Sequence, residues 1–338
     1  MRHQHISIFA PKNIIIVTGL LWMFCFAGTA SAVSPDLLPF SIDQDALGSR
    51  TPLLLIHGLQ TNSQNADYWH IWDEFATYYS GENDLSSEVK PYYFTYETLS
   101  DSIDGNPTNL YEIGKSLRDE IQARYDSGEF QDKQLIIVAY SMGGLVARSM
   151  MQQYQFTDGD RGGNKIARLI TLGTPHHGTP AANNAYMYRL DLFINVYQDF
   201  LLDLSWDSID NLVYWYSNPG LQHLNHYQYA PGYYSKIIAY GAEVDRSVSP
   251  YYVTDDSLIP GFEFLEICGY SNDGIVPLIS AVFSGVTGPT RRLVDATCDH
   301  TTLPQGTCTV NGAALFDTIK ADILSAISAT KTPAIDEQ

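Results

Sequence analysis

Unbroken apolar runs alternate with amphipathic stretches through the middle of the chain. Residues 135–138 (Leu-Ile-Ile-Val) form the clearest run, and β-branched side chains of this kind are typical of a strand buried on both faces of a parallel sheet. The apolar positions then change to every fourth residue, at Val146, Met150 and Tyr154, which predicts a helix. A buried strand is therefore expected to pass into a helix across residues 139–144.

The same two patterns recur along the rest of the chain. Further strands are expected at residues 52–57, 91–96, 166–172, 236–241, 262–269 and 291–296, and further helices at 66–80, 108–125 and 311–329. Because strands and helices alternate, we expect the α/β class, with a mostly parallel central sheet covered by helices on both faces. Its crossovers should be right-handed.

Residues 180–235 interrupt this rhythm with a long aromatic stretch. One amphipathic helix is expected around residues 192–204, followed by a loop-like segment over 214–234. We interpret residues 180–235 as an insertion that covers the functional site, a cap or lid. The alternative is a helical excursion that belongs to the core.

The first 32 residues have the pattern of an export signal. Arg2 and Lys12 give a basic start, residues 13–28 are apolar but short for a membrane span, and Ala30-Ser31-Ala32 is typical of a cleavage site. We therefore expect residues 1–32 to be a signal peptide and 33–338 to be one exported domain, secreted or periplasmic.

Composition narrows the classes of partner. The chain holds 38 acidic and 19 basic residues, a net charge of −19, which disfavours binding to nucleic acid and to anionic membranes. Its 23 tyrosines and 5 tryptophans favour wet aromatic contacts with lipid, carbohydrate or another protein. The oligomeric state is left open by these patterns.

Three cysteines remain after the expected signal. Export permits a disulfide, and we favour Cys298–Cys308, which closes a short loop; Cys268–Cys298 is the alternative. The spacing matches no zinc pattern, and no cofactor or metal is expected.

The junction between the central strand and its helix carries a candidate nucleophile. In Ala139-Tyr140-Ser141-Met142-Gly143-Gly144, the serine lies at a sharp strand-to-helix turn, where free helix N–H groups lie beside its hydroxyl. Small residues at 139 and 143 let the helix pack against the strand. This is the layout of a nucleophile elbow, with Ala139 replacing the first glycine of G-x-S-x-G. The alternative is an ordinary serine N-cap.

A serine hydroxyl needs a base and an acid, which follow the serine in the α/β-hydrolase chain order. His300, the last histidine, lies between the last expected strand and the C-terminal helix, where the base should be. For the acid we favour Asp273, expected directly after the strand over 262–269, with Asp245 as its rival. Asp295 and Asp299 are too near His300 in sequence to reach its far nitrogen.

The tetrahedral intermediate of acyl transfer needs N–H donors directed at its oxyanion. The first candidate is the backbone of Met142, the residue after the nucleophile. The second is Leu59, in the loop after the 52–57 strand, where Gly58 allows close backbone approach. We expect His57 to be a structural residue of that loop rather than a base.

Five short motifs carry a resemblance to secreted bacterial triacylglycerol lipases and to GPI-inositol-deacylase-like esterases of the α/β-hydrolase superfamily. They are His-Gly-Leu at 57–59, the elbow at 139–144, Leu-Gly-Thr-Pro-His-His-Gly-Thr-Pro at 172–180, Asn-Asp-Gly-Ile-Val-Pro at 272–277 and Asp-His at 299–300. The resemblance spans about residues 50–325. It implies a triad of Ser141, Asp273 and His300, with Leu59 and Met142 forming the oxyanion hole.

One departure from that family concerns calcium. Many of these lipases have an acidic residue just after the catalytic histidine that helps to bind the ion, whereas Thr301-Thr302-Leu303 follows His300 here. No calcium site of that kind is expected.

These observations predict a secreted serine hydrolase of carboxylic esters, a lipase or esterase that acts through an acyl-serine. We expect lipid or other ester substrates and transient contact with a lipid interface. The alternatives are an acyltransferase or polyester depolymerase with the same triad, and a non-catalytic binding module of hydrolase fold.

Overall fold

The structure of the protein is a computed structural model that describes residues 35–59, 68–96, 109–182, 204, 206, 219–228, 230–244, 258–295 and 298–331. All of these residues belong to one unit, residues 32–338. The expected signal over 1–32, the expected helix over 192–204 except Leu204, and Asp245 lie outside the described residues.

A sheet of seven strands forms the centre of the described part of the chain. The strands are β1 (Asp36–Pro39), β2 (Thr51–Ile56), β3 (Val89–Thr95), β4 (Leu135–Tyr140), β5 (Ile166–Leu172), β6 (Ile237–Gly241) and β7 (Thr290–Leu293). Their order in the sheet is β1-β3-β2-β4-β5-β6-β7, and all neighbours are parallel except β1 and β3. The predicted mostly parallel sheet is confirmed, with one antiparallel edge strand that the apolar pattern does not reveal.

Helices and short turns connect these strands. The helices are α1 (Asp73–Gly81), α2 (Asn83–Glu88), α3 (Leu110–Asp126), α4 (Met142–Gln153), α5 (Gly162–Lys165), α8 (Pro219–His226), α9 (Ala230–Tyr234), α10 (Ile259–Ile267), α11 (Leu278–Ala281) and α12 (Leu315–Lys331). Two 3-10 turns, Tyr68–Trp72 and Leu303–Gln305, and a hairpin of β8 (Thr309–Val310) and β9 (Ala313–Ala314) complete the described elements. No helix within the described ranges is long and apolar enough to cross a membrane.

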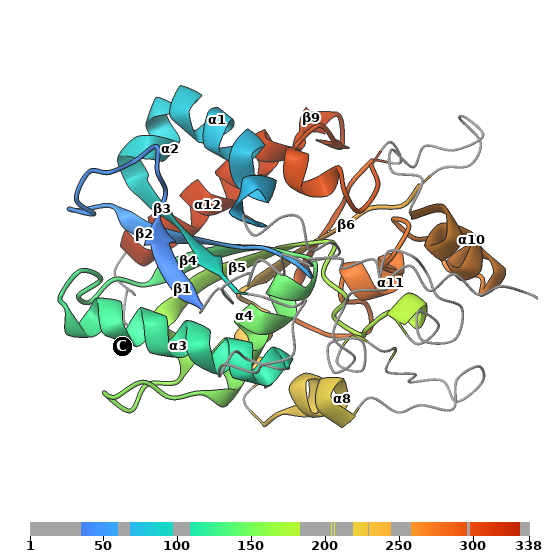
Figure 1. Cartoon of the computed structure of the whole chain (residues 1–338), viewed down its shortest axis with the longest axis horizontal. Helices are drawn as coiled ribbons and strands as arrows, with labels where there is room; N and C mark the ends of the chain where they lie inside the picture. The colour runs from blue at the N-terminus through green and yellow to red at the C-terminus, as the bar shows by residue number, and fades with distance from the viewer. Residues whose placement is uncertain are drawn as a thin grey trace, which may run out of the picture. The chain divides into compact units, whose positions relative to one another are not determined.

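Two apolar layers cover the two faces of the sheet, as alternation along a central strand requires. On β4, Ile137 faces the layer that holds α3 and α4, whereas Ile136 and Val138 face the layer that holds α1 and α12. Figure 1 shows this division, with α1 and α12 on one side of the strands and α3 and α4 on the other. The sheet is therefore held from both sides, and β4 lies at its centre.

The parallel arrangement brings the candidate site to one edge of the sheet. Tyr140, the last residue of β4, pairs with Leu172, the last residue of β5. Ser141 follows at once, and its backbone N–H donates to the carbonyl of Leu172 at 2.8 Å. The nucleophile candidate is thus fixed at the carboxyl edge, where open α/β sheets bind their ligands.

The strand predicted over 262–269 is wrong, because residues 262–267 belong to the helix α10 and a turn follows them. Phe-Glu-Phe-Leu-Glu-Ile is a short apolar run that suits either a strand or a helix, but the buried large apolar side chains are Leu258, Phe262 and Leu265, which follow helical spacing. A proline in the first turn of α10 also suits a helix start. The loop-like reading of 214–234 is likewise wrong in part, because α8 and α9 lie within it.

Candidate active site

Ser141 lies at the junction of β4 and α4 with a backbone that L-residues rarely adopt. Its φ is 52° and its ψ is −129°, so the turn is strained, as expected for a nucleophile elbow. Glycines allow the turn to pack. A Cβ on Gly143 would lie 2.3 Å from the carbonyl oxygen of His57, and one on Gly58 would lie 2.7 Å from the Cβ of Ser141. The loop after β2 is therefore pressed against the serine.

The structure brings Ser141, His300 and Asp273 together. His300 Nε2 is 2.9 Å from Ser141 Oγ, and His300 Nδ1 is 2.8 Å from Asp273 Oδ2. The three residues are 8%, 3% and 0% exposed. Because a carboxylate can only accept, the Asp273 contact gives Nδ1 the proton and leaves Nε2 free to accept the proton of the serine hydroxyl.

Asp273 lies in a tight turn between α10 and α11, not directly after a strand as predicted. Its Oδ1 accepts the backbone N–H groups of Ile275 at 3.1 Å and Val276 at 2.8 Å, which leaves Oδ2 for the imidazole. The carbonyl of Asp273 also accepts the backbone N–H of His300 at 2.8 Å. The acid is thus oriented by its own turn and tied to the histidine through two separate bonds.

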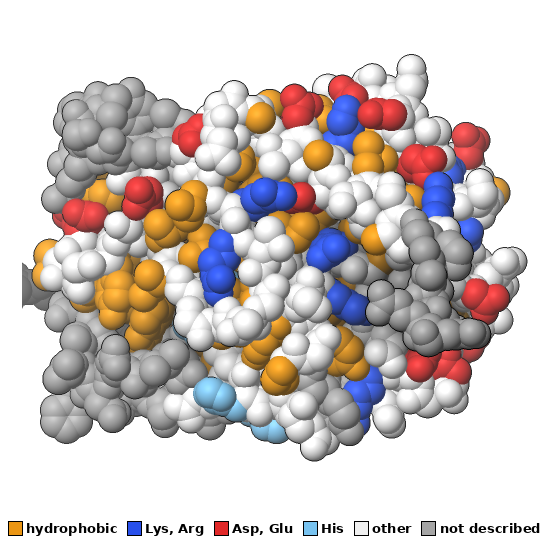
Figure 2. All heavy atoms as spheres, turned by 180° about the vertical axis from the view of Figure 1, so that it is seen from behind, with side chains coloured by type: hydrophobic (Ala, Val, Ile, Leu, Met, Phe, Trp, Pro, Cys, Tyr) orange, Lys and Arg blue, Asp and Glu red, His pale blue; other side chains and the backbone are white. Residues whose placement is uncertain are grey.

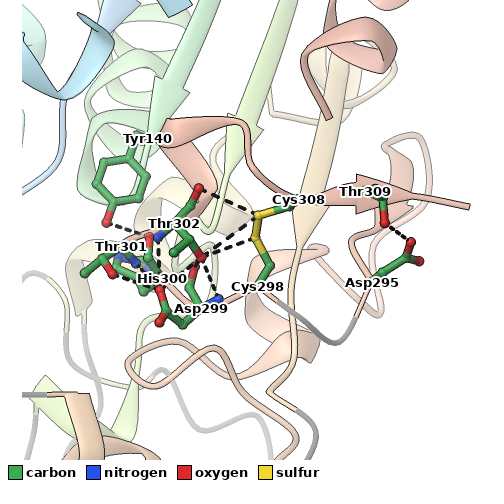
Figure 3. The surroundings of a disulfide bond; sticks show 9 residues. All are labelled: Tyr140, Asp295, Cys298, Asp299, His300, Thr301, Thr302, Cys308 and Thr309. Carbon is green, nitrogen blue, oxygen red and sulfur yellow. Dashed lines mark hydrogen bonds between the residues drawn. A yellow bond between two sulfur atoms is a disulfide. The ribbon is translucent and has the colours of Figure 1, made fainter. Parts of the chain in front are cut away.

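The loop that carries His300 is closed by a disulfide between Cys298 and Cys308, the pairing favoured from the sequence (Figure 3). Inside the loop, Asp299 Oδ1 accepts the backbone N–H groups of Thr301 and Thr302, both at 3.0 Å. The hydroxyl of Tyr140 donates to the carbonyl of His300 at 2.9 Å, as Figure 3 also shows. Asp299 therefore shapes the turn and does not serve as the acid.

The two predicted oxyanion donors lie on segments that meet at Ser141. Met142 is the first residue of α4, where backbone N–H groups have no partner within the helix. Leu59 follows Gly58, the residue pressed against Ser141. Their role at an oxyanion stays a prediction.

His57 holds the backbone of this second segment, as its structural interpretation requires. Its Nδ1 is 2.8 Å from the carbonyl oxygen of Gly58, its Nε2 accepts the backbone N–H of Tyr96 at 3.3 Å, and its ring stacks on that of Tyr96 at 4.0 Å. Burial lowers the pKa of His57 from 6.5 to about 4. The ring is therefore neutral near pH 7, with its proton on Nδ1.

The histidine pair after β5 lies outside the triad, in a buried network around Arg148. The guanidinium of Arg148 donates to Asn225 Oδ1 at 2.8 Å and to the carbonyl of His176 at 3.4 Å, and it stacks over Phe283 at 4.4 Å. Burial lowers the pKa of Arg148 to about 10, which keeps it charged at neutral pH. His177 Nε2 contacts the carbonyl of Ser284 at 2.8 Å. This network holds α4, α8 and the segment after β5 together.

Sequence reasoning missed two residues that touch the triad. Gly173 lies against the imidazole and the carboxylate, because a Cβ there would be 3.1 Å from both His300 Nδ1 and Asp273 Oδ2. The hydroxyl of Thr174 donates to the carbonyl of Ser141 at 2.8 Å. Both belong to the 172–180 motif, which the sequence reveals, but the sequence does not reveal which residues the motif contacts. In the described residues, no group of three or more His, Cys, Asp or Glu side chains could hold a metal ion.

Comparisons with known proteins identify the family and the fold of the chain. The model of the PGAP1-like alpha/beta domain matches residues 48–239, more than half of the chain, a stretch that includes Ser141 but ends before Asp273 and His300. No curated protein matches the sequence.

Solved structures share the fold. The mature form of the Bacillus licheniformis lipase BlEst2 is 17% identical, with a TM-score of 0.54 over 86% of this chain and 97% of that one. Its propeptide form is 18% identical, with a TM-score of 0.50 over 79% of this chain and 50% of that one. The chain therefore belongs to the PGAP1-like alpha/beta domain family and has the α/β-hydrolase fold of a bacterial lipase.

Proposed function

We propose that the protein is a serine hydrolase of carboxylic esters that acts through an acyl-serine intermediate. The observation that carries this proposal is the relay from Ser141 Oγ through the imidazole of His300 to Asp273, with contacts of 2.9 and 2.8 Å. These are hydrogen-bond distances for a nucleophile, its base and the group that orients the base.

The proposed reaction has two halves. Ser141 Oγ attacks the ester carbonyl carbon while His300 Nε2 takes the hydroxyl proton, and His300 then gives that proton to the departing alcohol. A water molecule next loses a proton to Nε2 and attacks the acyl-serine, which releases the acid and returns the proton to Oγ. Asp273 keeps Nδ1–H oriented and stabilises the imidazolium, and the backbone of Leu59 and Met142 would bind the oxyanion of each tetrahedral intermediate.

Three observations support the substrate class that we propose. The structurally similar Bacillus licheniformis protein BlEst2 is a lipase. Apolar side chains are exposed on α10 and α11, with Ile267 86% and Ile279 44% accessible. The helix α10 also packs on the turn of the acid, since a Cβ on Gly261 would lie 2.4 Å from the carbonyl oxygen of Gly274. We propose esters with apolar acyl chains, met at a lipid interface, with residues 180–235 as the cap.

Export is the second part of the proposal. The pattern of residues 1–32 supports a cleaved signal peptide, and a Cys298–Cys308 disulfide suits an oxidising compartment. We propose a secreted or periplasmic domain over residues 33–338.

Replacement of the nucleophile tests the activity. Ser141→Ala should abolish hydrolysis of p-nitrophenyl esters of medium chain length, because the alanine has no oxygen to acylate, and its circular dichroism should match that of the wild type. The matched control is Ser149→Ala, which removes another buried serine hydroxyl, from the helix that follows Ser141. Hydrolysis by Ser141→Ala at the wild-type rate would contradict the proposal, because the reaction would then not pass through an acyl group on Ser141.

A further inference from the structure

Thr174 lies beside the nucleophile but is not one of the three relay residues. It follows β5 and the turn at Gly173, and its side chain is fully buried, at 0% exposure. Its Oγ1 donates a hydrogen bond of 2.8 Å to the carbonyl oxygen of Ser141. The hydroxyl thus contacts the backbone of the nucleophile, not its side chain.

The carbonyl that Thr174 binds belongs to the same peptide group as the N–H of Met142. A peptide group is planar, so a bond that fixes the direction of the Ser141 carbonyl also fixes the direction of the Met142 N–H. Hydrogen bonds in a chain also polarise one another, so a donor on the carbonyl makes the N–H a stronger donor. Both effects act on the N–H proposed to bind the oxyanion.

The neighbouring residues leave room for this contact. A Cβ on Gly144 would lie 2.1 Å from Thr174 Oγ1, so any larger residue at 144 would displace the hydroxyl. The Ser141 carbonyl also accepts the Gly144 N–H at 3.1 Å, and the Ser141 N–H donates to the Leu172 carbonyl at 2.8 Å. The backbone of Ser141, strained at a φ of 52°, is therefore held on both sides, from the end of β5 and from Thr174.

We propose that Thr174 is a positioning residue whose hydroxyl fixes the peptide group between Ser141 and Met142, and with it the oxyanion donor and the direction of the nucleophile. This inference rests on the proposed ester hydrolysis. The methyl group of Thr174 fills space beside Gly144, so the hydroxyl and the methyl group are separable by substitution.

Two substitutions at Thr174 separate the hydrogen bond from the packing. Thr174→Val keeps the shape of the side chain and loses the hydroxyl. Its kcat should fall about tenfold to hundredfold, with KM nearly unchanged. This loss should not exceed the loss on removing an oxyanion donor itself, which is roughly hundredfold or greater. Thr174→Ser keeps the hydroxyl and loses the methyl group, and it should restore most of the lost kcat. Rates are divided by the fraction of chains that a fluorophosphonate labels at completion, so that misfolded protein does not count.

Thr171→Val is the matched control. Thr171 is also fully buried, on β5, but its hydroxyl lies 3.0 Å from His176 Nε2 and makes no contact with Ser141. Its kcat should stay within about twofold of the wild type, since its hydroxyl does not reach the peptide that binds the oxyanion.

The outcomes distinguish this inference from the proposed function. A Thr174→Val enzyme with wild-type kcat, a Thr174→Ser enzyme that is the weaker of the two, or an equal loss in Thr171→Val would overturn the positioning role while ester hydrolysis stands. Full activity of Ser141→Ala in the same assay would overturn both.

Discussion

At the scale of single residues, the candidate site depends on a glycine as well as on its reactive groups. Gly173 has a φ of 58°, a conformation that favours glycine. A side chain there would crowd the point where the carboxylate of Asp273 meets the imidazole of His300, at 3.1 Å from each. The absence of a Cβ thus leaves space for the hydrogen bond on which the relay depends.

Gly173→Ala should therefore reduce both stability and rate. The left-handed backbone should cost about 1–2 kcal/mol of unfolding free energy. The imidazole and carboxylate must also shift by a few tenths of an ångström, and we expect kcat to fall about tenfold, since misplacement by about 1 Å can cost a factor of about a hundred. Urea unfolding and ester hydrolysis measure the two effects.

Gly128→Ala is the control for backbone strain. Gly128 has a φ of 78°, and a Cβ there would meet nothing within 4 Å. It should show a similar loss of stability with wild-type kcat. Equal kcat in the two variants would show that Gly173 has no bearing on the relay.

The meeting of Ser141 and His300 was predictable because each of these candidate residues has a local signature. Ser141 lies where an apolar run meets a helical pattern, and His300 is the last histidine before the C-terminal helix. The contact of Thr174 with Ser141 joins residues 33 apart in the chain, and Gly173 meets side chains about a hundred or more residues later. Such contacts depend on the register of β4 against β5, which a single sequence does not specify.

At the scale of elements, the buried strands were easy to predict, whereas the edge strand β1 and the helix α10 were not. The predicted strand over 166–172 matches the bounds of β5, because a strand covered on both faces is rich in apolar residues. The edge strand β1 has only one fully buried residue in four and gives no such run. The helix α10 was taken for a strand because its apolar residues form a short run that a single sequence does not distinguish from a strand. In the structure α10 packs with Val244 and Ile275 in a small cluster apart from the two main layers.

The loop between β7 and α12 carries His300 and is closed by the Cys298–Cys308 disulfide, with both cysteines buried. Replacing both cysteines by serine should lower the unfolding free energy by about 2–4 kcal/mol. Because His300 is two residues from Cys298, kcat should fall as well.

Cys268→Ser is the control, since it removes a thiol that is not part of this disulfide. We expect its urea midpoint and its kcat to stay near those of the wild type. If the double variant also kept both values, the disulfide would have no role in holding the histidine loop.

At the scale of the whole molecule, topology explains why residues far apart in sequence meet at one edge of the sheet. The serine follows β4, and the acid and base come from later segments that return to the same carboxyl ends. The α/β class was predictable from alternation alone, whereas the depth of the site was not: the hydroxyl-bearing residue Ser141 is only 8% exposed.

Surface charge agrees with a neutral substrate rather than a polyanion. The chain carries a net charge of −19, and on the face drawn in Figure 2 the Lys and Arg side chains are scattered among neutral and apolar ones. Binding to nucleic acid requires a concentrated basic surface. Binding of an uncharged ester does not require a basic surface. Apolar side chains lie exposed on the same face (Figure 2).

The most direct test of the central claim is to locate the reactive serine in the folded protein. We expect a fluorophosphonate to add one phosphonyl group per chain, mapped by mass spectrometry to the peptide that contains Ser141, and we expect His300→Ala to label far more slowly because its serine has no base. A folded wild-type protein that takes up no label, or that carries it on any residue other than Ser141, would contradict the account.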